Sequence, residues 1–307
     1  MNLYPLKLTS ITIPKIWGEE IWHMVQMDDR LSIVENGYLA ENDLGDLLEV
    51  YMGELVGDHV YDQYGNTFPL LFKIINTNDD LSIQVHPDND VALEDRGCLG
   101  KTEMWYVVDA QPNTTLISGF NRDTNAAEVR AAVENGNLTD YLNVVNVKKG
   151  DVIFLPAGRV HALQKNITVA EIQQNSDVTY RLYDYNRPQI EGIPRPLHIE
   201  QSLRVLDYKH LQNPLSPYTP VKNGAVNLVE SKVFITNLLS FDHPIGRDYA
   251  PLDSFVVYMC VEGEADVEAE NTIVNLKKGD TVLIPASLDE VFLTPHGKTK
   301  LLETYIP

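Results

Sequence analysis

Three polar residues that could act as metal ligands lie within residues 81–103. Gln84 and His86 stand two positions apart in a short apolar stretch, and Glu103 follows after a polar segment. Because side chains alternate faces along a β-strand, Gln84 and His86 would lie on the same face. Pro87 has no N–H for a strand ladder, so the strand should end there. Two adjacent candidate ligands followed by a carboxylate suit a divalent metal of the zinc type.

A fourth candidate ligand is His161, which comes just after a Pro-Ala-Gly turn at residues 156–158. A single strand histidine is more often a hydrogen-bonded structural residue than a metal ligand. However, a Gln-x-His pair, a carboxylate after a loop and a histidine after such a turn rarely occur together by chance. Chemistry alone leaves both interpretations open, a metal site or structural histidines.

Four sequence blocks resemble the type I mannose-6-phosphate isomerases, specifically the short bacterial form of this family within the cupin superfamily. The resemblance covers most of residues 17–187, with the blocks in the right order. The blocks are residues 84–88 (QVHPD), 100–106 (GKTEMWY), 156–162 (PAGRVHA) and 170–181 (AEIQQNSDVTYR). The resemblance implies that His86, Glu103 and His161 are the metal ligands. Gln84 matches a metal ligand that is seen in longer members of the family.

The resemblance also implies an activity, the interconversion of mannose 6-phosphate and fructose 6-phosphate by proton transfer between C1 and C2. One zinc ion, or another divalent metal, per chain would polarise the carbonyl as a Lewis acid. The active-site arginine of the family falls on Arg181, whose permanent charge suits a developing enediolate. Lys101 would share the face of Glu103 if the strand began that early. Lys101 is the candidate base, and phosphate binding or plain surface charge are its alternative roles.

One departure from the family pattern follows His161. The family usually has a glycine-bearing turn there, whereas this chain has Leu-Gln-Lys-Asn at residues 163–166. Asn166 can adopt the left-handed conformation that glycine would supply, so we expect the turn to survive.

Two functions from other classes remain open. Another metal-dependent cupin enzyme, such as a dioxygenase, would usually show two histidines in its first motif, where Gln84 replaces one in this chain. A non-catalytic, sugar-sensing cupin would not need Lys101, Glu103 and Arg181 together.

Composition narrows the class of protein further. The chain has 307 residues, 44% of them hydrophobic and 22% charged, which is ordinary for a globular protein of two domains. A net charge of −20 argues against nucleic-acid binding. A dianionic sugar phosphate would therefore need local positive charge from the metal, Lys101, Arg181 or Arg187.

Features of the sequence also predict location and partners. No apolar run approaches the roughly 18 residues of a membrane span, and the N-terminus lacks the pattern of a signal peptide. The two cysteines, Cys98 and Cys260, form no C-x-x-C motif. We therefore expect a reduced, cytoplasmic protein. The resemblance implies a small sugar phosphate as its partner, and we expect a monomer or homodimer.

Short strands separated by turns predict a mainly β fold. An internal repeat adds detail, because residues 148–157 (KKGDVIFLPA) recur as residues 277–286 (KKGDTVLIPA). This pattern resembles the second motif of cupins and predicts two tandem cupin jelly-roll barrels, with a few helices packed on the N-terminal one. Glu290 stands at the position of His161 in the second copy, so we expect the second barrel to be metal-free.

The predicted domain order follows the chain. We expect an N-terminal catalytic cupin domain with helical insertions (1–211), a Pro-rich linker (212–224) and a C-terminal metal-free cupin domain (225–307). Apolar spacing predicts a helix over residues 44–55, and residues 88–99 read as a polar loop. A further helix is expected from Asp123 or Thr124 through Leu142.

Overall fold

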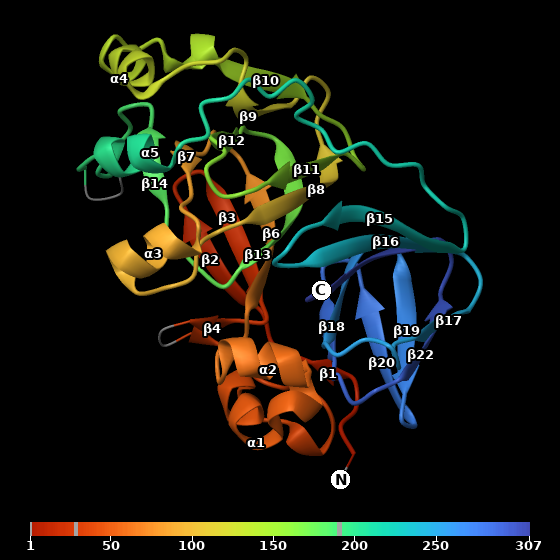
Figure 1. The fold of residues 1–307 in the computed structure, drawn as a ribbon. Coiled ribbons are helices and arrows are strands. Elements are labelled where there is room, and N and C mark those ends of the chain that lie inside the picture. Colours follow the sequence, from red (N-terminus) through yellow and green to blue (C-terminus); the bar gives the residue numbers. More distant parts are fainter. Residues whose placement is uncertain (1, 28–29, 189–191) are drawn as a thin grey trace. The chain divides into compact units, whose positions relative to one another are not determined.

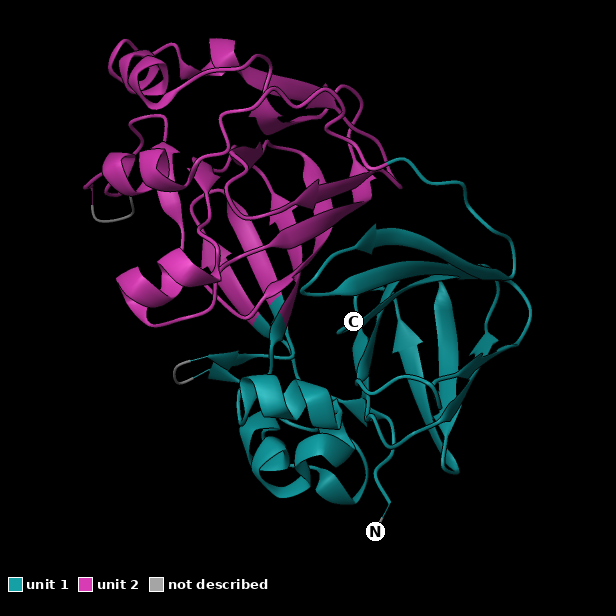
Figure 2. Cartoon of the chain, in the orientation of Figure 1, with its two compact units in different colours: residues 1–11, 22–70, 217–307 teal, residues 12–21, 71–216 magenta. Residues whose placement is uncertain are grey.

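The computed structural model describes residues 2–27, 30–188 and 192–307. These residues form mainly β-strands, as the sequence predicts (Figure 1). The chain divides into two compact units (Figure 2). Unit 2 comprises residues 12–21 and 71–216, and unit 1 comprises residues 1–11, 22–70 and 217–307.

Unit 2 is built on two sheets that enclose an apolar cluster containing Trp105, Leu116 and Leu163. One sheet has, in spatial order, β10 (Leu142–Asn146), β9 (Thr115–Phe120), β12 (His161–Leu163), β7 (Ile83–Val85) and β14 (Tyr180–Tyr183). The other has β11 (Val152–Leu155), β8 (Glu103–Ala110), β13 (Ile167–Gln174), β6 (Leu70–Thr77), β3 (Gly18–His23) and β2 (Ile11–Lys15).

The faces of strand β12 show which side chains point between these sheets. Leu163 belongs to the cluster between the sheets. Ala162 belongs to a second cluster, which also contains Val129 and Leu203 of two helices. Because neighbouring strand residues point to opposite faces, His161 shares the inner face with Leu163.

Three helices accompany unit 2: α3 (Asn89–Arg96), α4 (Ala126–Glu134) and α5 (Ile199–Val205). Helices α4 and α5 cover the outer face of the five-stranded sheet through the second cluster (Figure 1). The predicted polar loop at residues 88–99 is wrong, because it contains α3. Asp88 caps this helix by accepting from the N–H of Val91, and Gly97, with φ of +69°, ends it. Only Ala92 of α3 is buried, so the sequence shows no apolar stripe.

The helix predicted from residue 123 or 124 through Leu142 is shorter than expected. It begins after Asn125, whose side chain accepts from the N–H of Glu128, and Gly136 with φ of +73° prevents its continuation. A short 3₁₀ helix, η2 (Leu138–Tyr141), follows, and Leu142 already begins strand β10.

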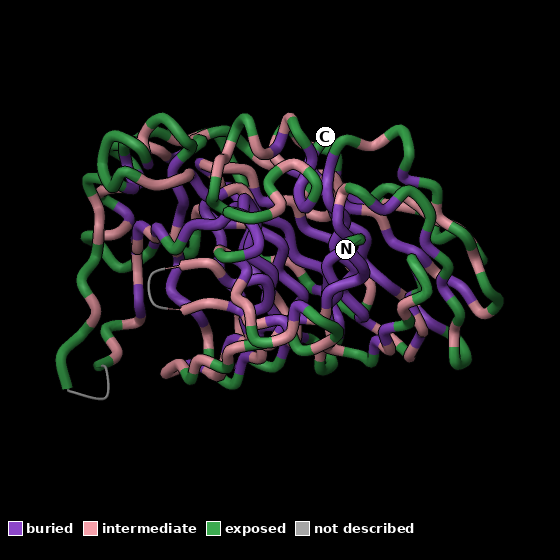
Figure 3. The backbone as a smooth tube through the Cα atoms, turned by 90° about the horizontal axis from the view of Figure 1, so that it is seen from below, coloured by how far each residue is buried: buried purple, intermediate pink, exposed green. Residues whose placement is uncertain are grey.

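Unit 1 also contains two main sheets, which enclose an apolar cluster around Tyr258, Val267 and Leu301. One sheet has β1 (Leu6–Lys7), β21 (Thr281–Ile284), β18 (Val256–Glu262), β23 (Thr299–Tyr305), β16 (Ile235–Phe241) and β15 (Gly224–Glu230). The other has β17 (Ile245–Asp248), β22 (Glu290–Pro295), β19 (Glu264–Ala269) and β20 (Thr272–Lys277). A small ribbon pairs β4 (Gln26–Met27) with β5 (Arg30–Leu31). Buried residues, purple in Figure 3, lie mainly in the strands of both units, and exposed residues, green in Figure 3, lie mainly in the loops.

The strand order is the same in the two units. The order β11-β8-β13-β6 of unit 2 matches β21-β18-β23-β16 of unit 1, and β10-β9-β12-β7 matches β20-β19-β22-β17. Strands β11 and β21, which follow the two Lys-Lys-Gly-Asp turns, occupy the same place in this order. The duplicated order supports the two tandem jelly rolls that the repeat predicts.

The predicted helix at residues 44–55 is present as α1 (Leu44–Val56), and α2 (Asp58–Tyr64) follows it. Both helices belong to unit 1. The rings of Phe68 and Phe255 are 4.7 Å apart, and the N–H of Phe255 donates to the carbonyl of Val56 at 3.1 Å. Helices therefore accompany the C-terminal barrel as well as the N-terminal one. The compact units also do not follow the predicted boundaries at 211 and 225, because residues 22–70 group with the C-terminal barrel.

Candidate metal centre and active site

Four polar residues form one row across the five-stranded sheet of unit 2. Ser118 on β9 pairs with His161 on β12, His161 pairs with Gln84 on β7, and Gln84 pairs with Arg181 on β14. Residues that pair directly in antiparallel strands share a face. All four side chains therefore start from the inner face that His161 shares with Leu163. The register thus brings three residues singled out in the sequence, which lie far apart in the chain, to one wall of the barrel.

His86 and Glu103 complete a compact group with His161. Their ligand atoms all lie within 4.8 Å of one another, and the three side chains are buried. Nε2 of His161 is 3.2 Å from Oε1 of Glu103, and Nε2 of His86 is 3.6 Å from Oε2. Glu103 can reach these imidazoles because it is the first residue of β8, in the opposite sheet.

The two imidazoles are oriented by backbone carbonyls. Nδ1 of His86 lies 2.7 Å from the oxygen of Val178, and Nδ1 of His161 lies 2.9 Å from the oxygen of Arg159. Each Nδ1–H can donate to its carbonyl, which leaves the lone pair of Nε2 directed at the group. Burial and the charge of Lys101 lower the pKa of His86 well below its usual value. His86 is therefore a neutral imidazole, the form that binds metals.

Glu103 is an ionised carboxylate in this buried group. Burial alone would raise its pKa, but the ammonium of Lys101, followed by the neighbouring imidazoles of His161 and His86, outweighs burial and lowers the pKa well below its usual value. Neither carboxylate oxygen accepts a well-directed hydrogen bond within the described structure. Two imidazole nitrogens and a carboxylate oxygen that converge within 4.8 Å of one another fit a divalent ion of the zinc type.

Gln84 and Lys101 lie beside this group. Nε2 of Gln84 is 3.4 Å from Nε2 of His161, and the amide oxygen of Gln84 accepts from the hydroxyl of Ser82 at 3.2 Å. Lys101 precedes strand β8 and so does not share its face by strand alternation. Its ammonium nevertheless lies 2.8 Å from Oε2 of Glu103. Burial would lower the pKa of Lys101, but nearby carboxylates, Glu103 first, outweigh it and raise the pKa.

Arg181 lies at the end of the row, near other arginines. Its Nε is buried and has no hydrogen-bond partner in the described structure. Burial and the charge of Arg195 lower its pKa. Asp184 accepts from Arg187 at 3.0 Å and from Arg195 at 2.7 Å, so one buried carboxylate fixes both guanidinium groups.

The turn after His161 also forms, because Asn166 adopts φ of +68°.

Sequence reasoning missed a buried ionic network in the opposite sheet. The indole N–H of Trp105 donates to Glu171 at 2.8 Å, and the Trp105 ring meets His161 edge-on at 5.3 Å. The ammonium of Lys73 lies 3.1 Å from Glu171 and 2.6 Å from the amide oxygen of Gln173. The alternation of Glu171 and Gln173 on one strand was the available signal, since two polar side chains on one strand face need buried partners.

The described residues of unit 1 contain no corresponding group. Glu290 is exposed and Val291 is the inward residue of β22, so the counterpart of His161 by sequence points away from the interior. In the first repeat, Leu155 precedes the proline and pairs with Glu103. In the second repeat, Ile284 precedes the proline and pairs with Val256, so a valine stands where unit 2 has the carboxylate. Among the described residues, the group around Glu103 is the only cluster of three His, Cys, Asp or Glu with metal-ligand spacing.

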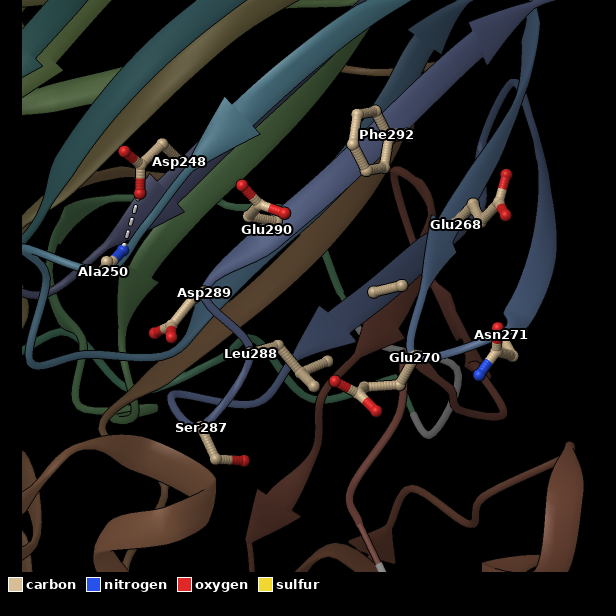
Figure 4. A pocket seen from close by; sticks show the side chains of 11 residues that line it. Asp248, Ala250, Glu268, Glu270, Asn271, Ser287, Leu288, Asp289, Glu290 and Phe292 are labelled. Atoms are coloured by element: carbon tan, nitrogen blue, oxygen red, sulfur yellow. Dashed lines mark hydrogen bonds between the residues drawn. The ribbon is translucent and has the colours of Figure 1, made fainter.

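Glu290 instead lines a surface pocket of about 650 Å³ in unit 1 (Figure 4). Five carboxylates line it, from Asp248, Glu268, Glu270, Asp289 and Glu290. A pocket with this charge would repel a dianionic sugar phosphate, the substrate that the sequence resemblance implies.

Comparisons with known proteins agree with this fold. Residues 11–113 match the family described as phosphomannose isomerase type I, catalytic domain, and residues 247–306 match mannose-6-phosphate isomerase, cupin domain. The mannose-6-phosphate isomerase ManA of Bacillus subtilis is 34% identical, covering 94% of this chain and 90% of that protein. The mannose-6-phosphate isomerase of Streptococcus mutans is 33% identical over 92% of this chain and 93% of that protein.

The solved structure of mannose 6-phosphate isomerase from Bacillus subtilis has a TM-score of 0.87 at 29% identity, covering 98% of this chain and 99% of the other. The fold and the buried His–Glu–His group define a cupin with a candidate metal centre in unit 2. The chain belongs to the type I mannose-6-phosphate isomerase family, which confirms the resemblance seen in its sequence blocks. No helix in the described part of the chain is long and apolar enough to cross a membrane.

Proposed function

We propose that this protein interconverts mannose 6-phosphate and fructose 6-phosphate. The observation that carries the proposal is the convergence of His86, Glu103 and His161, with Lys101 against the carboxylate, in a chain of this family. A cytoplasmic location and a monomeric or homodimeric state stay predictions.

The three converging residues would hold one divalent ion, and their donor set favours zinc. Gln84 stands beside them as a possible fourth ligand. When bound, the ion supplies a Lewis acid that polarises the substrate carbonyl, which makes the neighbouring C–H acidic enough to lose its proton.

Lys101 is the candidate for moving that proton between C1 and C2. In the described structure its raised pKa keeps it an ammonium held by Glu103, a form that donates a proton or a hydrogen bond. A base role requires the added positive charge of a metal to lower this pKa, so it stays a prediction. The alternative role of phosphate contact also stays open.

Positive charge for the substrate comes from the arginines around Asp184. Arg181 starts from the same sheet face as the candidate ligands, and its Nε is free to donate. We propose that Arg181 meets the charge that develops on the enediolate, since a guanidinium stays protonated throughout. The phosphate could bind to Arg187 and Arg195. Asp184 fixes both guanidinium groups, and all three residues lie close to Arg181 in the sequence.

A coupled assay for fructose 6-phosphate formation from mannose 6-phosphate tests the proposal. We expect turnover that disappears on chelation and returns with zinc. A sugar-sensing cupin would bind the sugar phosphate without turnover, and a dioxygenase would consume oxygen instead. Absence of turnover in protein with its full metal content would overturn the proposed function.

A further inference from the structure

We propose that Gln174 is a positioning residue that, together with Asn89, fixes Lys101 beside Glu103. This proposal rests on the role proposed above for Lys101 in the isomerisation. It concerns the segment from Gly100 to Thr102, which leads into strand β8 and has no strand ladder of its own.

Three consecutive backbone N–H groups of this segment have partners in three different places. The N–H of Gly100 donates to the side-chain oxygen of Asn89 at 2.9 Å. The N–H of Lys101 donates to the carbonyl of Pro87 at 3.0 Å. The N–H of Thr102 donates to the side-chain oxygen of Gln174 at 2.9 Å. Two of the three acceptors are therefore side chains rather than regular secondary structure.

These two side chains also bind each other. Nε2 of Gln174 donates to the side-chain oxygen of Asn89 at 3.0 Å, and the backbone N–H of Gln174 donates to the carbonyl of Thr102 at 3.1 Å. Gln174 is buried at the end of β13, and Asn89 is the first residue of α3. The Gln174–Asn89 pair, which we call the amide clip, thus joins a strand end and a helix start across the segment that carries Lys101.

The backbone is closely packed at the same place. A Cβ on Gly100 would lie 2.4 Å from the carbonyl carbon of Asp88 and 2.6 Å from the backbone nitrogen of Asn89. The segment therefore approaches the start of α3 as closely as a glycine permits, and the amide clip holds it there.

Position matters because Lys101 acts at the end of a long, flexible stem. Its ammonium lies 2.8 Å from Glu103 and 3.3 Å from Nε2 of His86, distances that a shift of the backbone would change. A displacement of about 1 Å at a reacting group can cost on the order of 100-fold in rate. The amide clip supplies a reason for a glutamine at residue 174, since one side chain must both accept from Thr102 and donate to Asn89.

The test compares Gln174→Met, Lys101→Met and the double variant. Methionine keeps the volume and removes both hydrogen bonds. We expect Gln174→Met to lower kcat by about 10- to 100-fold with metal content retained. In the Lys101→Met background, the same substitution should lower kcat by no more than a few-fold, because its effect passes through Lys101.

Gln26→Met is the matched control. Gln26 likewise accepts from a backbone N–H, that of Phe68, and donates to a carbonyl, that of Asn66, but in unit 1. It should lower the Tm less than Gln174→Met, because Gln26 is only half-buried, and leave kcat within a few-fold. Asn89→Asp, which keeps the acceptor for both hydrogen bonds, should retain more activity than Asn89→Ala.

Hydrogen exchange of the Thr102 N–H separates this proposal from the role of Lys101. Faster exchange in Gln174→Met shows that the amide clip holds the segment. Unchanged exchange, or losses in kcat that multiply in the double variant, would overturn the proposal.

If Lys101→Met keeps its kcat, the role of Lys101 is wrong, and the proposed positioning for catalysis falls with it. If Gln174→Met does not fold, the Asn89 pair decides: equal kcat and exchange in Asn89→Asp and Asn89→Ala overturn the amide clip.

Discussion

Glu103 stays ionised in a fully buried position, and this is the decisive feature at the residue scale. An isolated buried carboxylate would take up a proton, because burial disfavours the charged form. Here Lys101 and the two histidines reverse that effect and lower the pKa. The site therefore offers an anionic carboxylate oxygen from Glu103 and a neutral imidazole nitrogen from His86, the protonation states that a divalent metal requires.

Metal content is the first prediction at this scale. We expect native protein to bind one divalent ion per chain, and His86→Ala and Glu103→Ala to lose most of it, because each removes one of three converging ligands. Elemental analysis after dialysis measures this loss. His243→Ala, at an exposed histidine of unit 1, should keep the full content. Full metal content in both ligand variants would contradict the assignment.

Arg181 is expected to act on the transition state more than on substrate binding. Removing a donor that meets charge developing only during reaction typically costs on the order of 100- to 1,000-fold in kcat. We therefore expect Arg181→Ala to lose kcat with a smaller change in KM, measured by steady-state kinetics. A raised KM at native kcat would instead assign Arg181 to the phosphate.

At the element scale, the two barrels use the same strand register for different chemistry. Trp105 pairs with Glu171 on strands β8 and β13, and Tyr258 pairs with Glu303 on the corresponding strands β18 and β23. Glu303 accepts from Arg247 at 2.8 Å, and Asn237 and Tyr249 also donate to it. Both carboxylate oxygens of Glu303 therefore accept hydrogen bonds, and neither is free to bind a metal.

Glu290→Gln tests whether the second barrel takes part in catalysis. Because Glu290 is exposed and Val256 replaces the ligand carboxylate, we expect turnover and metal content to stay within a few-fold of native. His161→Gln, at the corresponding position of the first repeat, should lose both. A loss in Glu290→Gln as large as that in His161→Gln would show that the second barrel is catalytic.

At the scale of the whole molecule, folding buries a histidine that the proposed chemistry does not use. His23 of unit 1 is buried, its Nδ1 lies 3.3 Å from the hydroxyl of Thr281, and its Nε2 has no hydrogen-bond partner in the described structure. Burial lowers its pKa to about 4, although Asp280 opposes this shift. His23 therefore stays neutral in the folded protein under conditions where the unfolded chain protonates it.

This histidine should make the protein less stable in acid. Its folded pKa is below its unfolded value near 6.5, so the unfolded state binds the extra proton between pH 6.5 and 4. Stability should therefore fall as the pH drops through this window, by about 3 kcal/mol in total. Urea unfolding at pH 7 and pH 4.5 measures the change.

His23→Gln, which cannot be protonated, isolates this contribution from that of the carboxylates. We expect its free energy of unfolding to fall less between the two pH values than that of the native protein. Equal falls in the two proteins would contradict the prediction. Activity at pH 7 should stay close to native, because His23 lies outside the candidate site.

The sequence by itself determined the features that depend on local chemistry and short periods. The Gln-x-His spacing singled out Gln84 and His86, of which His86 lies just past the end of strand β7, and the repeated Lys-Lys-Gly-Asp turns indicated a duplicated β fold. The left-handed turn at Asn166 was likewise expected from the residue type. Each of these depends on neighbours within a few positions, so a single sequence contains the necessary information.

Only the tertiary structure decided which distant segments meet. Pairing between strands brought Ser118 and Arg181 into the row of His161. Packing and hydrogen bonds grouped helix α1 with the C-terminal barrel. Strand pairing also turned Glu290 outward, because a one-residue change of phase in a strand moves a side chain to the other face. Such outcomes follow from long-range register and packing, which local sequence patterns do not specify.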